Sequence, residues 1–141
     1  MTQTLVIEAR FPSLNVTIAA AKRHWSVYAK EKRRLTLSVA LLAKAQGLKP
    51  VKRAVIRFTW YEANKRRDPD NISAAGKKPI LDGLVKAGVL KDDGWSAIQG
   101  LEDRFVVDKE WPRVEVTITP TQQENTHETI PDVPVAVLEG D

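Results

Sequence analysis

A proline set between two acidic residues, in the run Asp68-Pro69-Asp70-Asn71, constrains the fold more than any other feature of the sequence. The ring of Pro69 fixes φ near about −65° and disfavours helical conformation at Asp68. We therefore expect both carboxylates to lie on an extended or turn backbone, where Asx-type hydrogen bonding by Asp70 or Asn71 can bring them toward one point. Convergent carboxylates repel unless a cation neutralises them, and a hard cation such as Mg²⁺ suits that role.

An amphipathic helix is predicted directly after this turn. Its apolar side holds Ile80, Leu81, Leu84 and Val85, and its charged side holds Lys78, Asp82 and Lys86 at intervals of four residues. Asp70 or Asn71 is expected to cap the helix at its N-terminus, and Gly88 is expected to end it.

Pro79 and Asp93 set the expected geometry around this helix. Because the ring of Pro79 removes a backbone hydrogen bond, we expect the helix to kink or restart there. A helix from about residue 80 to residue 87 is about 12 Å long. The loop that follows is long enough to travel back over that distance, so Asp93 is expected to meet Asp70.

These residues together resemble the RusA-type Holliday junction resolvases. The resemblance covers about residues 53–119 and is carried by Asp68-Pro69-Asp70-Asn71, by Lys78 and Asp82, and by Gly88 followed by Asp92-Asp93. The family consists of small, homodimeric, Mg²⁺-dependent endonucleases of phage and prophage origin. They cut four-way DNA junctions symmetrically and leave ligatable nicks. The resemblance therefore implies branched DNA and a second copy of the chain as partners, and a role in DNA recombination and repair.

The resemblance also implies the site residues, which are Asp68, Asp70, Asp93 and Lys78. The three aspartates would bind Mg²⁺, with Mn²⁺ as a substitute, and Lys78 would hold or stabilise the scissile phosphate. In the best-studied members the lysine lies about four residues, or one helical turn, closer to the Asp-Asn pair. Lys77 therefore remains a rival for this role.

Two other acidic residues near the site are open to interpretation. Asp92 competes with Asp93, which is favoured only through the resemblance. Asp82 is expected to pair with Lys78 or Lys86 on the helix and not to bind the metal directly.

The distribution of charge suits a phosphate polymer. Residues 1–120 hold all 22 lysines and arginines against 13 acidic residues, whereas residues 121–141 hold five acidic residues and no lysine or arginine. We expect residues 1–120 to form one domain and residues 121–141 to form an acidic, disordered tail. The expected DNA contacts are Lys22, Arg23, Lys30, Lys32, Arg33, Arg34, Arg66, Arg67 and Lys77. Trp25 and Tyr28, interleaved with the first of these, either stack on bases or anchor the core.

Absent residue types exclude several kinds of site. There is no cysteine, and His24 and His127 are the two histidines. Thiolate chemistry and cysteine zinc sites are thereby excluded, and a histidine-based metal site is disfavoured. No apolar run approaches the roughly 20 residues of a membrane span, and the N-terminus does not resemble a signal peptide. We expect a cytoplasmic protein, host- or phage-encoded, with no membrane contact and no small-molecule cofactor.

Alternation of apolar and polar residues predicts four strands. They are expected at residues 4–11, 53–62, 97–108 and 113–119, with the last two joined as a hairpin around residues 109–112. A first helix is expected to run to about Ala45, where Gly47 and Pro50 end it. The order of these elements predicts an α+β domain in which two main helices pack against a small mixed sheet.

Two other functions remain open at this point. A nuclease of the same chemistry could act on forks, flaps or packaging intermediates. A DNA-junction-binding module without catalysis would use its carboxylates only to orient lysines and arginines against phosphates.

Overall fold

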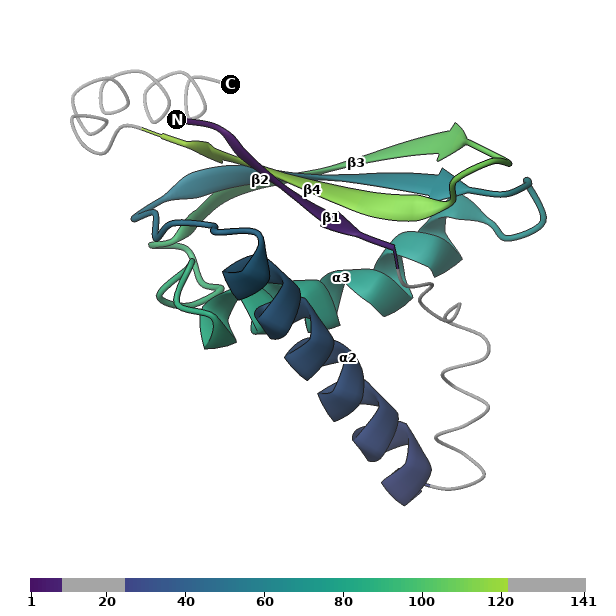
Figure 1. The fold of residues 1–141 in the computed structure, drawn as a ribbon, viewed down its shortest axis with the longest axis horizontal. Coiled ribbons are helices and arrows are strands. Elements are labelled where there is room, and N and C mark those ends of the chain that lie inside the picture. Colours follow the sequence, from purple (N-terminus) through teal and green to yellow (C-terminus); the bar gives the residue numbers. More distant parts are fainter. Residues whose placement is uncertain (9–24, 122–141) are drawn as a thin grey trace, which may run out of the picture.

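The part of the chain that the structure describes folds as an α+β arrangement of four strands and two helices. The computed structural model describes residues 1–8 and 25–121. The elements follow in the order β1 (Gln3–Ile7), α2 (Trp25–Ala45), β2 (Ala54–Glu62), α3 (Pro69–Lys86), β3 (Ile98–Val107) and β4 (Arg113–Pro120). The strands form one mixed sheet in the order β1-β4-β2-β3, and both helices lie on the same side of it (Figure 1). The predicted fold class is confirmed.

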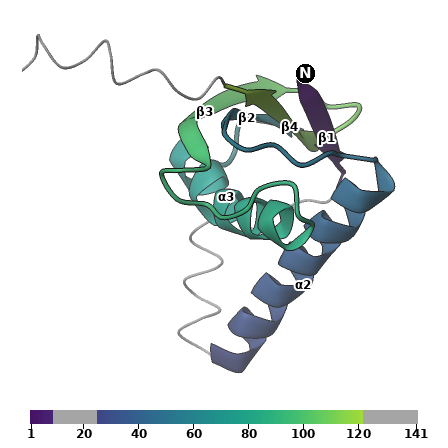
Figure 2. The ribbon, with the colours of Figure 1, turned by 90° about the vertical axis from the view of Figure 1, so that its left-hand side faces the viewer.

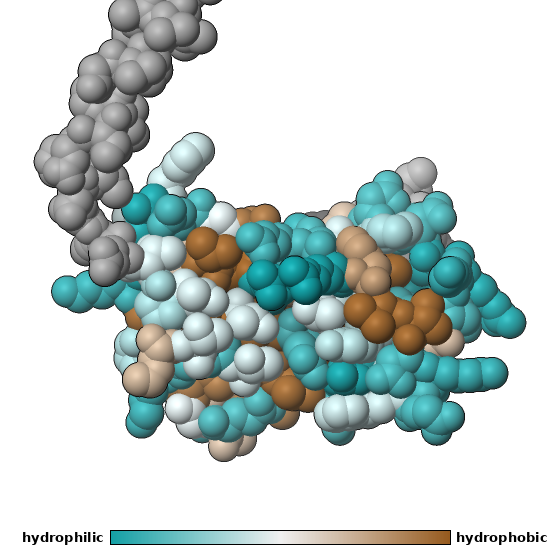
Figure 3. All heavy atoms as spheres, turned by 90° about the horizontal axis from the view of Figure 1, so that it is seen from above, coloured by the Kyte–Doolittle hydropathy of each residue, from teal (hydrophilic) through white to brown (hydrophobic). Residues whose placement is uncertain are grey.

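The core lies between the helices and one face of the sheet. Alternate residues of the central strand β2 are buried, namely Ala54, Ile56, Phe58 and Trp60. They pack with Leu5 and Ile7 of β1 and with Ile80 and Leu84 of α3. No described helix covers the other face of the sheet, and Figure 3 shows it as a mixture of hydrophilic and hydrophobic surface. Strands lie at all four predicted positions, although the first ends at Ile7. β1, β2 and β4 show the period-two burial that follows from the pleat, whereas most of β3 is exposed.

The predicted hairpin between the last two strands is wrong. β3 runs parallel to β2, β4 runs antiparallel to β2, and β2 separates the two. The crossover through α3 places β3 parallel beside β2, as βαβ connections require. The segment between β3 and β4 therefore passes the end of β2, where the Asp108 N–H donates to the Glu62 carbonyl at 2.8 Å.

α3 begins earlier than the sequence predicted. Asp68 is the N-cap residue, with φ −73° and ψ 145°, and Pro69 occupies the first turn. The extended conformation expected of Asp68 is confirmed. The expectation that Asp70 or Asn71 caps the helix is wrong, as is the expectation that Asp70 lies outside it. A proline suits the first helical position because its missing N–H would have no partner there.

The predicted restart at Pro79 is also wrong, because α3 runs unbroken from Pro69 to Lys86. Pro79 is buried inside it. Its ring removes one backbone hydrogen bond to Ala75, and the helix continues past this loss. The ends of both helices agree with the predictions. Gly47 and Gly88 adopt φ +75° and +82° just after α2 and α3, the left-handed conformation that glycine tolerates best. Neither helix of the described part is long and apolar enough to cross a membrane.

The crossing of α2 and α3 depends on Gly83. A Cβ atom added there would lie 2.5 Å from Cβ of Val39 and 2.9 Å from the carbonyl oxygen of Thr36. We expect Gly83→Ala to lower the free energy of unfolding by about 1–3 kcal/mol, the usual effect of overpacking, in thermal or urea denaturation. Gly100→Ala is the matched control, since its Cβ would approach Val55 no closer than 3.8 Å. Equal stability of the two variants would contradict this view of the crossing.

Candidate functional site

Lys78 on α3 is the centre of a charged cluster at the surface. Its Nζ atom lies 2.7 Å from Oδ2 of Asp93 and 3.1 Å from Oδ1 of Asp82. Asp82 follows Lys78 by one helical turn, and the loop after α3 brings Asp93 to the same point. The Lys78 side chain is 54% exposed, so a ligand in solvent can reach the cluster. The expected pairing of Asp82 with Lys78 is confirmed.

The charge states within this cluster support one another. The hydrogen bond to Asp93, followed by the one to Asp82, raises the pKa of Lys78 above its ordinary value. The hydrogen bond from Lys78, with the attraction of its positive charge, lowers the pKa of Asp93. At neutral pH Lys78 is therefore an ammonium and Asp93 a carboxylate.

Asp92 and Asp93 have different partners. The carboxylate of Asp92 accepts the Gly94 N–H at 2.8 Å and so belongs to the turn of the loop. Asp93 is the one that contacts Lys78. Of the two rivals, Asp93 is thus the residue that the described geometry joins to the charged side of α3.

The other predicted carboxylates lie at the start of α3. Asp68 caps the helix without a side-chain cap hydrogen bond, and Asp70 stands in its first turn. Both are exposed. Eight residues separate Asp70 from Lys78, which is about 12 Å along the helix axis. Nearby, Arg67 donates to both carboxylate oxygens of Glu62, at 2.9 and 3.0 Å, an ion pair that the sequence did not indicate.

The three aspartates do not form a metal-binding group in this structure. Within residues 1–8 and 25–121, no three histidine, cysteine or acidic side chains lie close enough together to hold a metal ion. The expected meeting of Asp93 with Asp70 assumed a helix that begins near Ile80. α3 begins instead at Pro69, and Asp93 forms an ion pair with Lys78. Metal binding by Asp68, Asp70 and Asp93 stays a prediction.

Lys77 faces the sheet and not the charged cluster. Its Nζ atom lies 2.7 Å from Oδ2 of Asp103 on β3 and 5.6 Å from the centre of the Phe58 ring. The other oxygen of Asp103 accepts the indole N–H of Trp60 at 2.9 Å. The contacts of Asp103 could not be predicted from the sequence, because they depend on β3 lying beside β2. Lys77 therefore binds sheet residues, whereas Lys78 points to solvent.

The described members of the predicted DNA-binding set lie mainly on the N-terminal half of α2, where Lys30, Arg33 and Arg34 are exposed and Lys32 is partly exposed. This half of the helix extends beyond the sheet, as Figures 1 and 2 show. Arg34 forms an ion pair with Glu31. Arg66 is exposed near the start of α3. Lys22 and Arg23 lie outside the described residues, as do the side chains of Trp25 and Tyr28.

Comparison with known families agrees with these observations. The model of the family described as "Endodeoxyribonuclease RusA" matches residues 13–119. Comparison with curated proteins gave no match. The match includes all the predicted catalytic residues and the basic cluster of residues 22–34, and it begins well before the region that the sequence motifs covered. The chain therefore belongs to the RusA family of endodeoxyribonucleases.

Proposed function

We propose that this endodeoxyribonuclease resolves four-way DNA junctions by paired, symmetric nicks and depends on Mg²⁺. The observation that carries the proposal is the contact between Lys78 and Asp93, whose charged atoms lie 2.7 Å apart. These two residues are fifteen positions apart in the sequence, and the family pattern singles out both. Their meeting on the exposed side of α3 supports Lys78, and not Lys77, as the lysine of the site.

The cluster has the chemistry that phosphodiester hydrolysis requires of side chains. In this reaction a water oxygen bonds to phosphorus, the bond to a bridging oxygen breaks, and negative charge grows on the phosphate oxygens. An ammonium within hydrogen-bond reach stabilises that charge, and Lys78 is exposed enough to provide it. The proposed Mg²⁺ dependence rests on the chemistry of Asp68, Asp70 and Asp93, whose carboxylates are the hard oxygen ligands that Mg²⁺ prefers.

The substrate class is supported by charge. Residues 1–120 carry the excess of lysine and arginine, and a basic domain binds DNA largely through its phosphates. β4 ends at Pro120, at the end of this basic part of the chain. We propose residues 1–120 as the nuclease domain and residues 121–141 as an acidic tail.

The test of the proposed function is incubation of end-labelled four-way junction, fork, flap and linear duplex with the protein, in Mg²⁺ and in EDTA. Preferred cutting of the junction in Mg²⁺ supports the proposal. Preferred cutting of forks or flaps would show that those structures are the substrates. Binding of DNA without cutting would show that the protein is a DNA-binding module without catalysis.

We further propose that two copies of the chain join through β3. This strand forms one edge of the sheet and, among the described residues, pairs with β2 alone. Large hydrophobic side chains along it are 40–48% exposed, namely Leu101, Phe105, Val106 and Val107. An exposed apolar edge strand is a ready template for pairing with another chain.

The sequence of β3 is complementary to itself in one register. If two β3 strands pair antiparallel about a twofold axis at Asp103, Leu101 lies opposite the partner's Phe105 and Glu102 lies opposite the partner's Arg104. Both kinds of cross-strand pair are stabilising. The two Asp103 carboxylates meet at the axis, and each keeps its ion pair with Lys77, which offsets their repulsion.

A cross-link tests this interface. Because the chain has no cysteine, we expect coexpressed Leu101→Cys and Phe105→Cys chains to form a disulfide-linked dimer under mild oxidation. Facing residues of paired strands lie within disulfide reach. Each variant alone should cross-link far less, as should Leu41→Cys on α2, which is 59% exposed. Equal cross-linking in the coexpressed sample and in either variant alone would contradict the register.

A further inference from the structure

Trp95 is an unusually exposed aromatic residue beside the charged cluster. Its side chain is 94% exposed, the highest value among the large hydrophobic residues of the described part. It follows Asp93 by two residues. Single exposed apolar residues are common, but a tryptophan normally buries most of its surface. An exposed tryptophan beside a ligand-binding site can therefore contact the ligand.

The turn that carries Trp95 is held in place on both sides. The carbonyl of Gly94 accepts the N–H groups of Ala97 and Ile98, at 3.1 and 3.0 Å. Ala97 is fully buried, and its carbonyl accepts the Ala54 N–H at 2.9 Å. On the other side, Asp93 is bound to Lys78. The indole therefore projects into solvent from an anchored turn.

Basic residues lie along the segment beside this loop. The Val51 N–H donates to the Val89 carbonyl at 2.9 Å, and the Ala54 N–H donates to the Ala97 carbonyl. The segment that leads into β2 thus runs next to the loop that carries Trp95. Lys52 and Arg53 lie between these two contacts on one segment, and Lys91 lies between them on the other.

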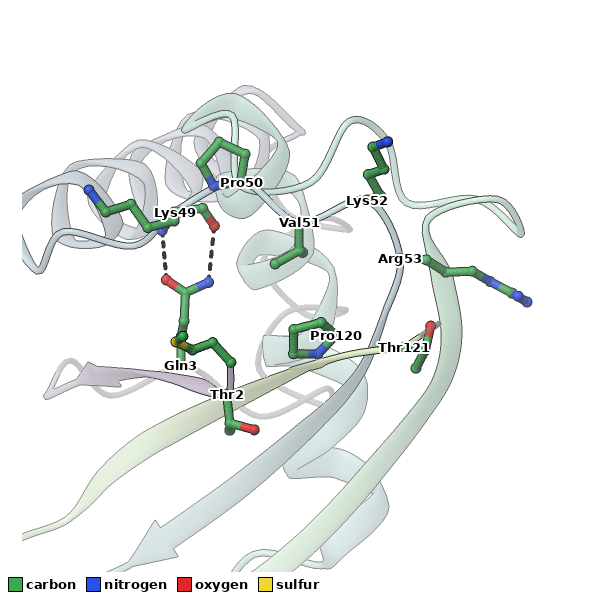
Figure 4. A pocket seen from close by; sticks show the side chains of 10 residues that line it. Thr2, Gln3, Lys49, Pro50, Val51, Lys52, Arg53, Pro120 and Thr121 are labelled. Atoms are coloured by element: carbon green, nitrogen blue, oxygen red, sulfur yellow. Dashed lines mark hydrogen bonds between the residues drawn. The ribbon is translucent and has the colours of Figure 1, made fainter. Parts of the chain in front are cut away.

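A cavity of about 520 Å³ opens at the same end of the sheet. Its lining includes Lys49, Lys52, Arg53 and Thr121 (Figure 4). In Figure 4 the charged ends of Lys49, Lys52 and Arg53 point outward from the rim of this cavity. Cations that point into solvent at one end of the sheet suit the phosphates of a DNA strand.

We infer that Trp95 stacks on an unpaired base of the bound DNA, with phosphates of the same strand held by the basic residues of the segment 49–53. Indole rings stack on bases of any sequence. In a continuous duplex the faces of each base are covered by its neighbours, so an open face exists only at a branch point or in a single strand. Trp95 would thus help to distinguish branched from linear DNA. This inference rests on the proposed function, whose substrate preference it would explain.

The test is DNA binding in EDTA, where the metal-dependent reaction does not proceed. We expect Trp95→Ala to weaken binding of a four-way junction about tenfold or more and to change the affinity for a long linear duplex little. Trp95→Phe should restore part of the junction affinity. A 2-aminopurine base at the branch point should be quenched on binding of the wild-type protein and much less on binding of Trp95→Ala. Trp111→Phe, a change at a tryptophan that is 45% exposed near the start of β4, is the control and should bind as the wild type does.

Three results would overturn the inference. Junction binding by Trp95→Ala equal to that of the wild type would remove the role in binding. An equal loss on junction and duplex would remove the role in distinguishing them. A change in oligomeric state of Trp95→Ala, measured by light scattering, would assign the indole to a contact between chains. Failure of the wild-type protein to cut any DNA in Mg²⁺ is a different result, which would refute the proposed function even if Trp95→Ala lost junction binding.

Discussion

Asp70→Asn is expected to abolish DNA cleavage while the fold and the affinity for DNA are retained. The substitution removes one negative charge and changes the shape of the side chain little. Asp70 is exposed in the first turn of α3, so the fold loses only its favourable interaction with the helix dipole, about 0.3–1 kcal/mol. A hard cation, however, loses a charged ligand. Binding should become slightly tighter, because a carboxylate near the DNA phosphates repels them.

The measurement is cleavage of a labelled junction in Mg²⁺, together with binding in EDTA and a thermal melt. Asp92→Asn is the matched control. The amide oxygen of asparagine can still accept the Gly94 N–H that Asp92 accepts now, so this variant should cut as the wild type does. Undiminished Mg²⁺-dependent cleavage by Asp70→Asn would remove Asp70 from the site. Loss of cleavage in Asp92→Asn, with Asp93→Asn still active, would show that Asp92 and not Asp93 belongs to the site.

Lys78→Ala is expected to slow cleavage of bound junction by about 100-fold or more, as loss of one charge contact in the transition state does. The variant should fold, because exposed ion pairs contribute at most about 1 kcal/mol. Lys77→Ala should behave differently. Its ammonium binds Asp103 and lies over the Phe58 ring, so its loss should lower stability and leave the single-turnover rate nearly unchanged.

Single-turnover rates at saturating protein measure this difference, because differences in affinity then drop out. Lys86→Ala is the control. It lies on the same charged side of α3, two turns beyond Lys78, and is exposed. A slow Lys77→Ala together with a normal Lys78→Ala would show that the wrong lysine has been placed at the scissile phosphate.

Patterns within single elements were predictable from the sequence. The alternation in β2 and the spacing of Lys78 and Asp82 follow from the geometry of strands and helices, so their burial and pairing could be predicted. Gly88 at the end of α3 adopts the conformation that its position indicated. The helix start was not predicted, because Pro69 disfavours helix in the residue before it and favours helix from its own position onward.

Relations between elements were not predictable in the same way. β3 and β4 follow each other in the sequence, yet β2 lies between them. Nothing in the short connection shows that a third strand separates them. The contacts of Asp103 with Lys77 and Trp60 depend on that strand order. The ion pair of Asp93 with Lys78 likewise depends on how the loop after α3 folds back onto the helix.

We propose that this RusA-family protein cuts four-way junctions by paired nicks. The most direct test is a four-way junction labelled on each strand in turn, incubated with wild-type protein in Mg²⁺ and mapped on denaturing gels, with ligase added to the products. We expect nicks in two opposite strands at symmetric positions, complete religation of the products, and no cutting in EDTA. Equal cutting of all four strands and of linear duplex, or no cutting of the junction at all, would contradict the claim.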